Sequence, residues 1–440
     1  GSNTPPASSA APAGSSAPAA NTDSAQTLRI YGWNTEFQDR FNAYFKDAGK
    51  LPEGMNVEWV ITPNENNAYQ NKLDADLKAQ DSAADKIDIF LIEADYALKY
   101  VDSDYTLDVK ADIGLTDEDL KDQYEYTKDI ATDSNKKLKA VSWQATPGLF
   151  AYRRSIAKDV LGSDDPVKVQ QALSDWDKFN AVAKTAHDKG YKMLSGYDDS
   201  YRTFANNITS PWVDENDTIH IDPIMMKWVD QTKEFTDKGY NNKTSLWAPE
   251  WGADQGPKGK VFGFFYSTWG INFTLLKNSL AVPVTEGGKA EVGNGVYGDY
   301  AVCQGPANYY WGGSWICGAK GSDNVDLVRD VMKTLTCDAA TMKKITQDTE
   351  DFTNNKTAMG ELAKSDYKSA FLGGQNHIAL FAEAAPKINM KNISKYDQGM
   401  TEEFQKAFKD YFDGNVSKDQ ALDNFYKAII EKYPNLKRAS

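Results

Sequence analysis

The pattern of apolar and polar positions predicts alternating strands and helices near the start of the chain. An apolar run at 28–31 is followed by Phe37, Phe41 and Phe45, which share one face of a helix. The stretch 86–102 repeats this scheme, with an apolar strand at 87–92, a polar bend at 93–95 and then a helix. Strands that alternate with helices indicate an α/β fold with a mostly parallel sheet covered on both faces.

In parallel sheets of this kind, the loops at the carboxyl ends of the strands carry the ligand. That rule selects Trp33, Asn34 and Glu36 after the first strand, and Glu93 and Asp95 after the strand at 87–92. These residues are therefore the first candidates for a binding site.

Two later segments predict amphipathic helices, at 175–191 and at 323–335, whose apolar stripes indicate core positions. The stretch "DENDTIHIDP" at 214–223 superficially resembles a calcium loop. It lacks the glycine at the sixth position and has Met225 where the bidentate glutamate belongs, so we predict a polar hairpin turn before a helix that starts near Pro223.

Length and charge narrow the class of protein. A chain of 440 residues exceeds the size at which a single core stops growing, so we expect two lobes. A net charge of −14 argues against nucleic acid and anionic membranes as main partners, and no apolar run approaches the ~18 residues of a membrane span. Residues 1–26 are mostly Ser, Ala, Pro, Gly, Asn and Thr, which is typical of a tether, although an ordinary flexible terminus has the same composition.

Signatures of covalent and metal chemistry are missing from the sequence. Its three histidines lack ligand spacing, and we find no nucleophile elbow, phosphate-binding loop or dinucleotide fingerprint. Cys303, Cys317 and Cys337 show no metal-binding spacing; a disulfide between Cys303 and Cys317 and three buried thiols remain open. A glycoside hydrolase stays an alternative, because its two carboxylates need no sequence motif.

Tryptophan is frequent and often lies in a polar or glycine-rich context. The 11 Trp residues include three that we assign to the core, Trp59, Trp176 and Trp228, and seven that need another account: Trp33, Trp143, Trp212, Trp247, Trp251, Trp269 and Trp311. A pyranose has an apolar face and a rim of hydroxyls, so its site needs flat rings together with amide or carboxylate groups. Neighbouring pairs supply this mixture: Trp33 with Asn34, Trp143 with Gln144, and Tyr310 with Trp311 beside Gln375 and Asn376. Glycines after Trp311 would let a sugar approach the backbone, but a ring beside glycine also fills packing gaps.

The order of several segments resembles the extracellular solute-binding proteins of carbohydrate ABC importers, the maltose-binding-like family. The resemblance rests on "LRIYGWNTEFQDRF", "IDIFLIEADYALKYVD", "TPGLFAYRRSIAKDVLG", "GKVFGFFYSTWGINF", "YGDYAVCQGP", "GGSWICGAK", "FLGGQNHIALFAEAAPKI" and "DGNVSKDQALDNFYKAI". It covers nearly everything after the tether. Arg153 and Arg154 depart from the family's Asn-Lys after the tyrosine, which affects local packing more than function.

This resemblance implies a periplasmic-binding-protein-like fold of two α/β lobes with a hinge and a ligand cleft between them. The lobes would comprise 27–143 with 302–336, and 144–301 with 337–440. Residues that match the family's ligand-facing loops are Trp33, Asn34, Glu36, Glu65, Asn66, Asn67, Glu93, Asp95, Trp143, Gln144, Trp269, Tyr310, Trp311, Gly312, Gly313, Gln375 and Asn376. Trp269 and Trp311 would stack on sugar faces, while Asn34, Glu65, Asp95, Gln144 and Asn376 would bind hydroxyls.

The resemblance also implies a function without covalent chemistry. We expect a monomer without cofactor or metal that binds an oligosaccharide, by general likeness a β-manno- or xylo-oligosaccharide, and delivers it to membrane permease subunits. Such a receptor would be an extracellular lipoprotein of a Gram-positive-type cell, anchored through a residue upstream of residue 1. A carbohydrate adhesin without a transport role is a further alternative.

Overall fold

The computed structural model describes residues 24–439, which form two compact units. The first unit contains the described residues up to Ala145, together with Gly312–Asp348 and Thr353–Met359. The second contains Thr146–Trp311, Thr349–Phe352 and the described residues from Gly360 onward. The chain therefore passes from one unit to the other at Ala145, at Trp311 and within the stretch 348–360.

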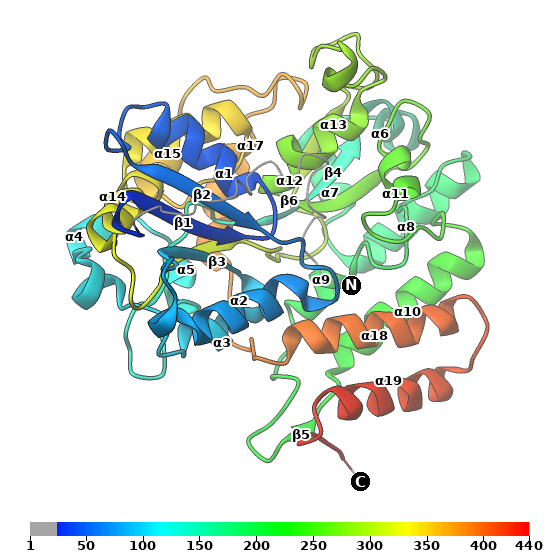
Figure 1. Cartoon of the computed structure of the whole chain (residues 1–440). Helices are drawn as coiled ribbons and strands as arrows, with labels where there is room; N and C mark the ends of the chain where they lie inside the picture. Colours follow the sequence, from blue (N-terminus) through cyan, green and yellow to red (C-terminus); the bar gives the residue numbers. More distant parts are fainter. Residues whose placement is uncertain (1–23, 440) are drawn as a thin grey trace. The chain divides into compact units, whose positions relative to one another are not determined.

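A four-stranded sheet forms the centre of the first unit (Figure 1). Its strands are β1 (Thr27–Gly32), β2 (Asn56–Ile61), β3 (Ile89–Glu93) and β8 (Ser314–Gly318), in the order β2-β1-β3-β8. β1 pairs in parallel with β2 and β3, and β8 pairs antiparallel with β3. The expected parallel sheet is thus present in β1 to β3, while β8 comes from a distant part of the chain and reverses direction.

The first unit also contains helices. They are α1 (Glu36–Phe41), α2 (Ala68–Lys78), α3 (Ala97–Val101), α4 (Asp117–Leu120), α5 (Glu125–Asp129), α14 (Val325–Thr336) and α15 (Ala339–Thr349). Of these, α3 packs on β3 and α14 on β8. Phe37, Phe41 and Phe45 are buried, as their helical spacing predicted; after Phe41 the helix continues as a π-helical turn at Asn42–Lys46. The apolar stripe of α14 is buried at Val328, Met332 and Leu335.

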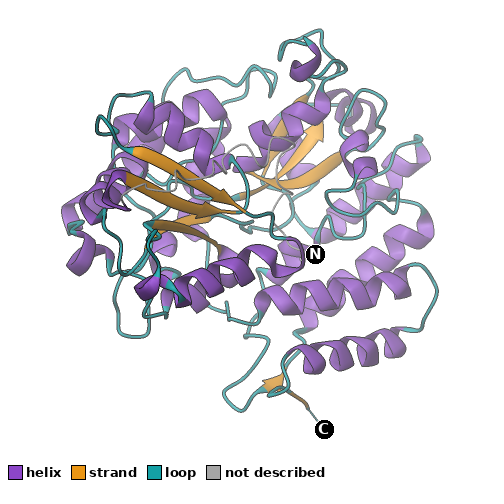
Figure 2. Ribbon diagram, viewed as in Figure 1, coloured by secondary structure: helices purple, strands orange, loops and turns teal. Residues whose placement is uncertain are grey.

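The second unit contains a three-stranded antiparallel sheet in the order β6-β4-β7 (Figure 2). Its strands are β4 (Gly148–Arg153), β6 (Gly263–Ser267) and β7 (Tyr300–Cys303). The helices around it are α6 (Arg154–Leu161), α7 (Pro166–Ala172), α8 (Trp176–Asp188), α9 (Tyr201–Ala205), α11 (Pro249–Asp254), α12 (Thr268–Gly270), α13 (Leu276–Ser279) and α17 (His377–Ala384). α16 (Lys356–Ala363) begins in the first unit and ends in the second.

Three long helices build a separate helical core within the second unit. α10 (Pro223–Lys238) packs against α18 (Asp397–Phe412), which packs against α19 (Lys418–Lys432). Trp212 and Trp228 contact Phe404 in this core, so both are packing residues. The hairpin predicted before Pro223 is confirmed by the antiparallel bridge between Val213 and Ile219, and β5 (Thr218–Ile219) pairs there with β9 (Lys437–Arg438).

Several expected boundaries differ from those in the structure. We expected the second lobe to resume at Cys337, but the first unit continues to Asp348 and also contains Thr353–Met359. Residues 1–23 of the expected tether lie outside the described residues, but Ser24–Gln26 form a 3₁₀ helix whose Ser24 carbonyl accepts from the Asn324 amide at 2.9 Å. Val302, which we expected to open a segment of the first lobe, lies in β7 opposite Ala151 of β4 and so belongs to the second unit. The change of unit occurs ten residues later, at Gly312.

The three cysteines are free thiols. Cys303 lies in β7 and Cys317 in β8, on two different sheets, and the disulfide that the sequence left open is absent.

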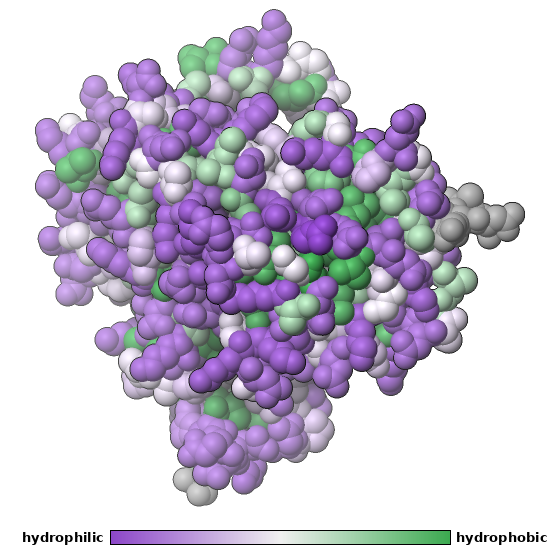
Figure 3. Space-filling model, turned by 90° about the vertical axis from the view of Figure 1, so that its left-hand side faces the viewer, coloured by the Kyte–Doolittle hydropathy of each residue, from purple (hydrophilic) through white to green (hydrophobic). Residues whose placement is uncertain are grey.

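Hydrophilic side chains predominate on the face drawn in Figure 3. Within residues 24–439, no helix is long and apolar enough to cross a membrane.

Candidate functional site

Three groups of predicted site residues lie at one edge of the sheet in the first unit. Since β1, β2 and β3 run parallel, their carboxyl ends meet at the same edge. The loops there carry the residues expected from the sequence: Trp33, Asn34 and Glu36 after β1, Glu65, Asn66 and Asn67 after β2, and Glu93 and Asp95 after β3. The topology thus gathers carboxylates and amides from segments that are about 30 residues apart in sequence.

Local hydrogen bonds shape these loops. The Asn34 side-chain oxygen accepts from the Glu36 backbone N–H at 3.0 Å, which turns the chain into α1. In the same way Glu93 Oε2 accepts from the Asp95 N–H at 3.2 Å. Each bond joins residues two positions apart and fixes a polar side chain at the end of β1 or β3.

The loop after β2 holds two consecutive residues in the left-handed region, Asn66 at φ 52° and Asn67 at φ 62°. Left-handed backbone is disfavoured for L residues, asparagine tolerating it better than most, and such conformations concentrate at binding sites. Glu65 and Asn66 are exposed, so their side chains are accessible for a ligand.

Trp33 is held by other aromatic rings. Its ring makes edge-on contacts with Tyr69 of α2 at 5.4 Å and with Tyr96 at 6.2 Å between centroids. Only a small fraction of Trp33 is exposed, 4%. These contacts hold the Trp33 ring in a fixed position in the loop after β1.

Trp143 and Gln144 have packing roles in the first unit. The Trp143 ring stacks on Phe37 of α1 at 5.4 Å and is almost completely buried. The Gln144 Oε1 accepts from the Ser314 N–H at 3.0 Å, at the start of β8. Both side chains are occupied by the core, and we leave them out of the candidate site.

The second unit contains a cluster of tryptophans, which we call the tryptophan cluster: Trp247, Trp251, Trp269 and Trp311. Trp247 lies roughly parallel to Trp269, with centroids 6.1 Å apart and planes at 24°, and contacts Trp251 at 4.9 Å. Trp311 contacts both Trp247 and Trp269 at 5.6 Å. Trp269 lies in α12, directly after β6, and Trp251 lies in α11. Trp311 is the last residue of the segment Thr146–Trp311 of the second unit.

Sequence reasoning selected Trp269 and Trp311 as site residues but neither Trp247 nor Trp251. Trp247 is the most accessible of the four, partly exposed, and its backbone has φ 69°, a strained value for a bulky residue. Its buried indole Nε1–H has no acceptor among the described residues. The only signal in the sequence was its polar context and its spacing of four residues from Trp251.

The run Tyr309-Tyr310-Trp311 separates into different roles. The Tyr309 hydroxyl is buried between the Leu149 and Tyr266 carbonyls, at 2.5 and 2.6 Å, so this ring belongs to the core. The backbone N–H of Tyr310 donates to the Asn206 side chain at 2.8 Å. Trp311 alone joins the tryptophan cluster.

Gly312 and Gly313 follow at the change of unit, with φ values of 68° and 109°. Both values lie in the region that glycine adopts most readily. The backbone conformation by itself therefore explains why glycine occurs at these two positions, without any role in ligand binding.

Gln375 and Asn376 use their side-chain amides within the second unit. Gln375 binds the backbone N–H and carbonyl of Val302 at 2.9 and 2.8 Å, which extends the edge of β7. Asn376 caps α17 through the Ala379 N–H and donates to the Leu362 carbonyl. These engagements differ from the hydroxyl-binding roles that we expected, and we leave both residues out of the candidate site.

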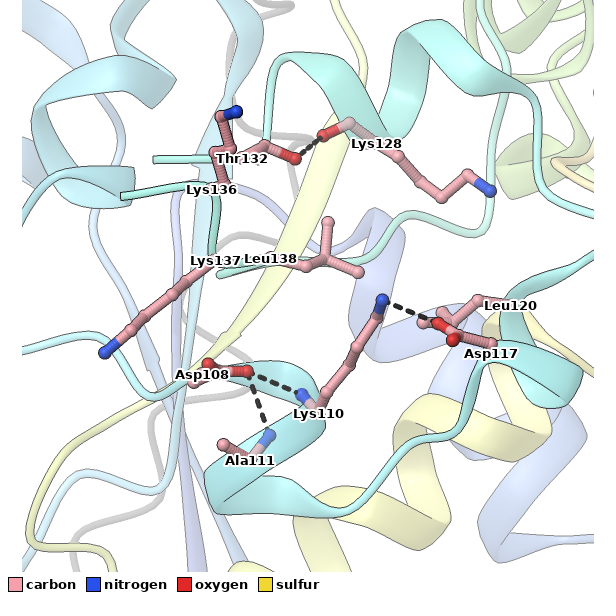
Figure 4. Close-up of a pocket in the computed structure, with 10 residues that line it drawn as sticks. All are labelled: Asp108, Lys110, Ala111, Asp117, Leu120, Lys128, Thr132, Lys136, Lys137 and Leu138. Atoms are coloured by element: carbon pink, nitrogen blue, oxygen red, sulfur yellow. Dashed lines mark hydrogen bonds and ion pairs between the residues drawn. The ribbon is translucent and has the colours of Figure 1, made fainter. Parts of the chain in front are cut away.

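A pocket of about 440 Å³ lies elsewhere in the first unit (Figure 4). Its lining includes four lysines and two aspartates, and both carboxylates are occupied: Asp117 pairs with Lys110 at 2.6 Å, and Asp108 accepts two backbone N–H groups. In Figure 4 the side chains of Lys110, Lys128 and Lys137 point in different directions. None of the predicted site residues and no aromatic ring lines this pocket, so it does not suit the stacking chemistry expected of a sugar site.

The described residues contain no group of three or more His, Cys, Asp or Glu side chains that could hold a metal ion. The first unit carries carboxylates and amides at a sheet edge, which are groups that bind hydroxyls. The second unit carries large flat rings, which are groups that stack on apolar faces.

The chain belongs to the bacterial extracellular solute-binding protein family, whose model matches residues 39–371. Comparison with curated protein sequences gave no significant match. The predicted membership in a solute-binding family is therefore confirmed by the family model.

Solved structures with the same fold include several sugar-binding proteins. A crystal structure described as extracellular solute-binding protein family 1 has a TM-score of 0.72 and 17% identity, covering 92% of this chain and 99% of its own. An ABC transporter associated binding protein from B. animalis subsp. lactis, in complex with β-1,6-galactobiose, has a TM-score of 0.68 and 17% identity, covering 94% and 100%. The galacto-N-biose-/lacto-N-biose I-binding protein from Bifidobacterium longum, in complex with lacto-N-biose, has a TM-score of 0.65 and 13% identity, covering 93% and 96%. These likenesses confirm the predicted class of fold.

Proposed function

We propose that this protein is the extracellular receptor of a carbohydrate ABC importer and that it binds an oligosaccharide between its two units. The observation that carries the proposal is the tryptophan cluster, which gathers four large rings within one unit, with Trp247 partly exposed and Trp251, Trp269 and Trp311 buried. Family membership and the sugar ligands of similar structures support the same class of ligand.

The physical roles of the two units are complementary. Trp247, Trp269 and Trp311 would stack on the apolar faces of sugar residues, a contact worth about 1 kcal/mol for each ring beyond the area it buries. Asn34, Glu36, Glu65, Asn66, Asn67, Glu93 and Asp95 of the first unit would bind the rim of hydroxyls.

Binding would close the two units about the three places where the chain passes between them. Gly312 and Gly313 occupy one of these places, and their positive φ values give that segment a backbone suited to a hinge. Closure would remove the sugar from water and create the surface that permease subunits recognise. We expect small-angle scattering to show compaction on saturation with ligand, and an unchanged radius of gyration would contradict hinge closure.

Attachment to the cell surface is a separate part of the proposal. The composition of residues 1–23 is that of a polar linker, and we propose an acylated residue upstream of residue 1. Metabolic labelling of the producing cells with a fatty-acid analogue should mark the protein if this is correct. A secreted protein without label would contradict the anchor and leave the binding function intact.

The test of the ligand is titration calorimetry against manno-, xylo-, gluco-, malto- and β-1,6-galacto-oligosaccharides of increasing length, followed by chromatography of each sugar. We expect one series to bind with a Kd in the micromolar range or tighter, with affinity rising to a plateau length and the sugar recovered intact. β-Manno- and xylo-oligosaccharides are our first candidates. Shortened sugars would indicate a glycoside hydrolase instead, and no binding across the panel would contradict the proposed ligand class.

A permease assay separates an importer receptor from an adhesin. Deletion of the gene in the producing organism should abolish uptake of the radiolabelled sugar that binds, and reintroduction should restore it. Normal uptake with lost adhesion to the glycan would favour the adhesin.

A further inference from the structure

Trp247 lies in a segment whose backbone is strained at two positions. Lys243 has φ 56° and Trp247 has φ 69°, and neither is glycine. Such conformations persist only where the surrounding structure holds them. The contacts that hold this segment therefore decide where the Trp247 ring lies.

A chain of side-chain hydrogen bonds joins the two ends of the segment 242–254, and we call it the Ser195–Asp254 clamp. Ser195 Oγ donates to Asp254 Oδ2 at 2.7 Å and lies 2.6 Å from Thr244 Oγ1, which can donate to it in turn. The Asn242 amide donates to the same Asp254 oxygen at 3.1 Å. The clamp thus connects Asn242 and Thr244, before Trp247, with Asp254, after it.

The backbone around Ser195 is fitted closely to this segment. The Asn242 N–H donates to the Ser195 carbonyl at 2.8 Å, and the Ser195 N–H donates to Asp199 Oδ2 at 3.0 Å. A Cβ at Gly196 would lie 2.1 Å from the Thr244 carbonyl oxygen, so only glycine allows this approach. Ser195 and Thr244 are both buried, which strengthens their hydrogen bonds relative to exposed ones.

One short helix carries both the clamp and an aromatic neighbour of Trp247. Asp254 is the last residue of α11, and Trp251 of the same helix contacts the Trp247 ring at 4.9 Å and 64°. If the clamp opened, α11 and the left-handed turn at Trp247 would lose their common anchor. The ring would then leave its near-parallel position beside Trp269.

We propose that Ser195 and Asp254 are positioning residues that hold Trp247 in the tryptophan cluster and thereby set the affinity of the site for its sugar. This inference rests on the proposed function. Neither residue needs to touch the ligand, because both act through the backbone conformation at Trp247.

The experiment compares three variants of the full chain: Asp254→Ala, Ser195→Ala and the matched control Asp254→Asn. Both bonds to Asp254 end on one oxygen, Oδ2, and the Asn amide oxygen can occupy the same place. Asp254→Asn therefore keeps the clamp, whereas Asp254→Ala removes it. Ser195→Ala deletes a single oxygen and serves as the second test if Asp254→Ala fails to fold.

The first readout needs no ligand. The 11 tryptophans are labelled as 5-fluorotryptophan, and the ¹⁹F resonance of Trp247 is assigned by its loss in Trp247→Phe. We expect this resonance to shift and broaden in Asp254→Ala and Ser195→Ala and to stay in place in Asp254→Asn. An unchanged Trp247 resonance in both alanine variants overturns the clamp.

The second readout is the affinity for mannotetraose, xylotetraose, maltotetraose and β-1,6-galactobiose. For the sugar that binds the unaltered protein, we expect the Kd to rise at least threefold in both alanine variants and to stay within about 1.5-fold in Asp254→Asn. A shifted resonance with unchanged affinity overturns the link to binding. If none of the four sugars binds the unaltered protein, the proposed ligand class is wrong and the affinity claim falls with it, while the resonance still decides whether the clamp positions Trp247.

Discussion

The indole N–H of Trp269 donates to the backbone carbonyl of Trp311 across 2.7 Å, and the two rings meet at 71°. The bond uses the single polar group of Trp269, so its orientation is set by the protein. The Trp269 ring is therefore held in one orientation before a ligand binds. This reduces the conformational entropy that is lost when a ligand stacks on it.

Removal of this ring should weaken sugar binding. We expect Trp269→Ala to raise the Kd by about fivefold or more, because a stacked ring contributes about 1 kcal/mol beyond its area. Trp269→Phe keeps a smaller ring but loses the bond to Trp311, and should give an intermediate loss. Titration calorimetry measures both.

The control for this pair is Trp176→Phe. Trp176 stacks on Phe204 at 4.5 Å, outside the tryptophan cluster, so its replacement should lower the free energy of unfolding without changing the Kd. Equal losses of affinity in Trp176→Phe and Trp269→Ala would show that the effect is general destabilisation.

Two buried titratable groups should give the second unit opposing pH dependences. Burial raises the pKa of Glu350, whose side chain accepts from the Ser369 hydroxyl, to about 7. Burial also lowers the pKa of His377 to about 4, and its neutral ring donates through Nε2 to the Glu350 carbonyl at 2.6 Å. Tyr367, near His377, and Tyr297 are the other titratable groups that face Glu350, and both are neutral in this range.

The signs follow from which state binds more protons. Between pH 4.5 and 7 the folded protein keeps a proton on Glu350 that the unfolded chain has lost, so this residue lowers stability as pH rises. Between pH 4 and 6.5 the unfolded chain binds a proton on His377 that the folded protein excludes, so this residue raises stability as pH rises. The two contributions oppose each other over nearly the same range.

Single substitutions should separate them. Urea unfolding of Glu350→Gln at pH 4.5, 5.5 and 6.5 should show stability that rises more steeply with pH than in the unaltered protein. His377→Gln should show the reverse change in slope. Slopes that match the unaltered protein in both variants would contradict the assigned protonation states.

Asn354 should be among the side chains on which the first unit depends. Its Oδ1 accepts from the Tyr124 N–H at 2.9 Å, and its Nδ2 donates to Thr127 Oγ1 and to the Ser142 carbonyl at 2.9 and 3.1 Å, all in a fully buried site. Asn354→Ala removes three buried hydrogen bonds, and we expect the free energy of unfolding to fall by about 2–4 kcal/mol. Chemical denaturation measures this difference.

Asn135 provides the comparison because its side chain is exposed. Asn135→Ala should change the free energy of unfolding by less than about 0.5 kcal/mol. A loss for Asn354→Ala that is no larger than this would contradict the buried network.

The two buried thiols, Cys303 and Cys317, should be unreactive in the folded protein, whereas Cys337 is partly exposed. Burial raises the pKa of Cys303 to about 12 and that of Cys337 to about 11, and it also raises the pKa of Cys317. We expect Ellman's reagent at pH 8 to react with at most one thiol, Cys337, in the folded protein and with three thiols after unfolding in denaturant without reductant. Fewer than three would indicate a disulfide or an oxidised cysteine.

The sequence by itself determined the local elements. The spacing of Phe37, Phe41 and Phe45 marked the buried face of the first helix, and the apolar stretch at 87–92 marked β3. Because both depend on a periodic burial pattern within a few residues, they needed no knowledge of distant parts of the chain. The same pattern placed Glu93 and Asp95 at the end of a strand.

Only the tertiary structure decided which aromatic and amide groups are occupied. Trp143 and Trp269 have similar polar neighbours in the sequence, yet one stacks on Phe37 in the core and the other joins the tryptophan cluster. The sequence made Gln375 a candidate sugar-binding residue, but in the structure its amide is hydrogen-bonded to the backbone of Val302 in β7. These assignments depend on strand pairing and on contacts between residues more than 20 positions apart, and local periodicity carries no information about such contacts.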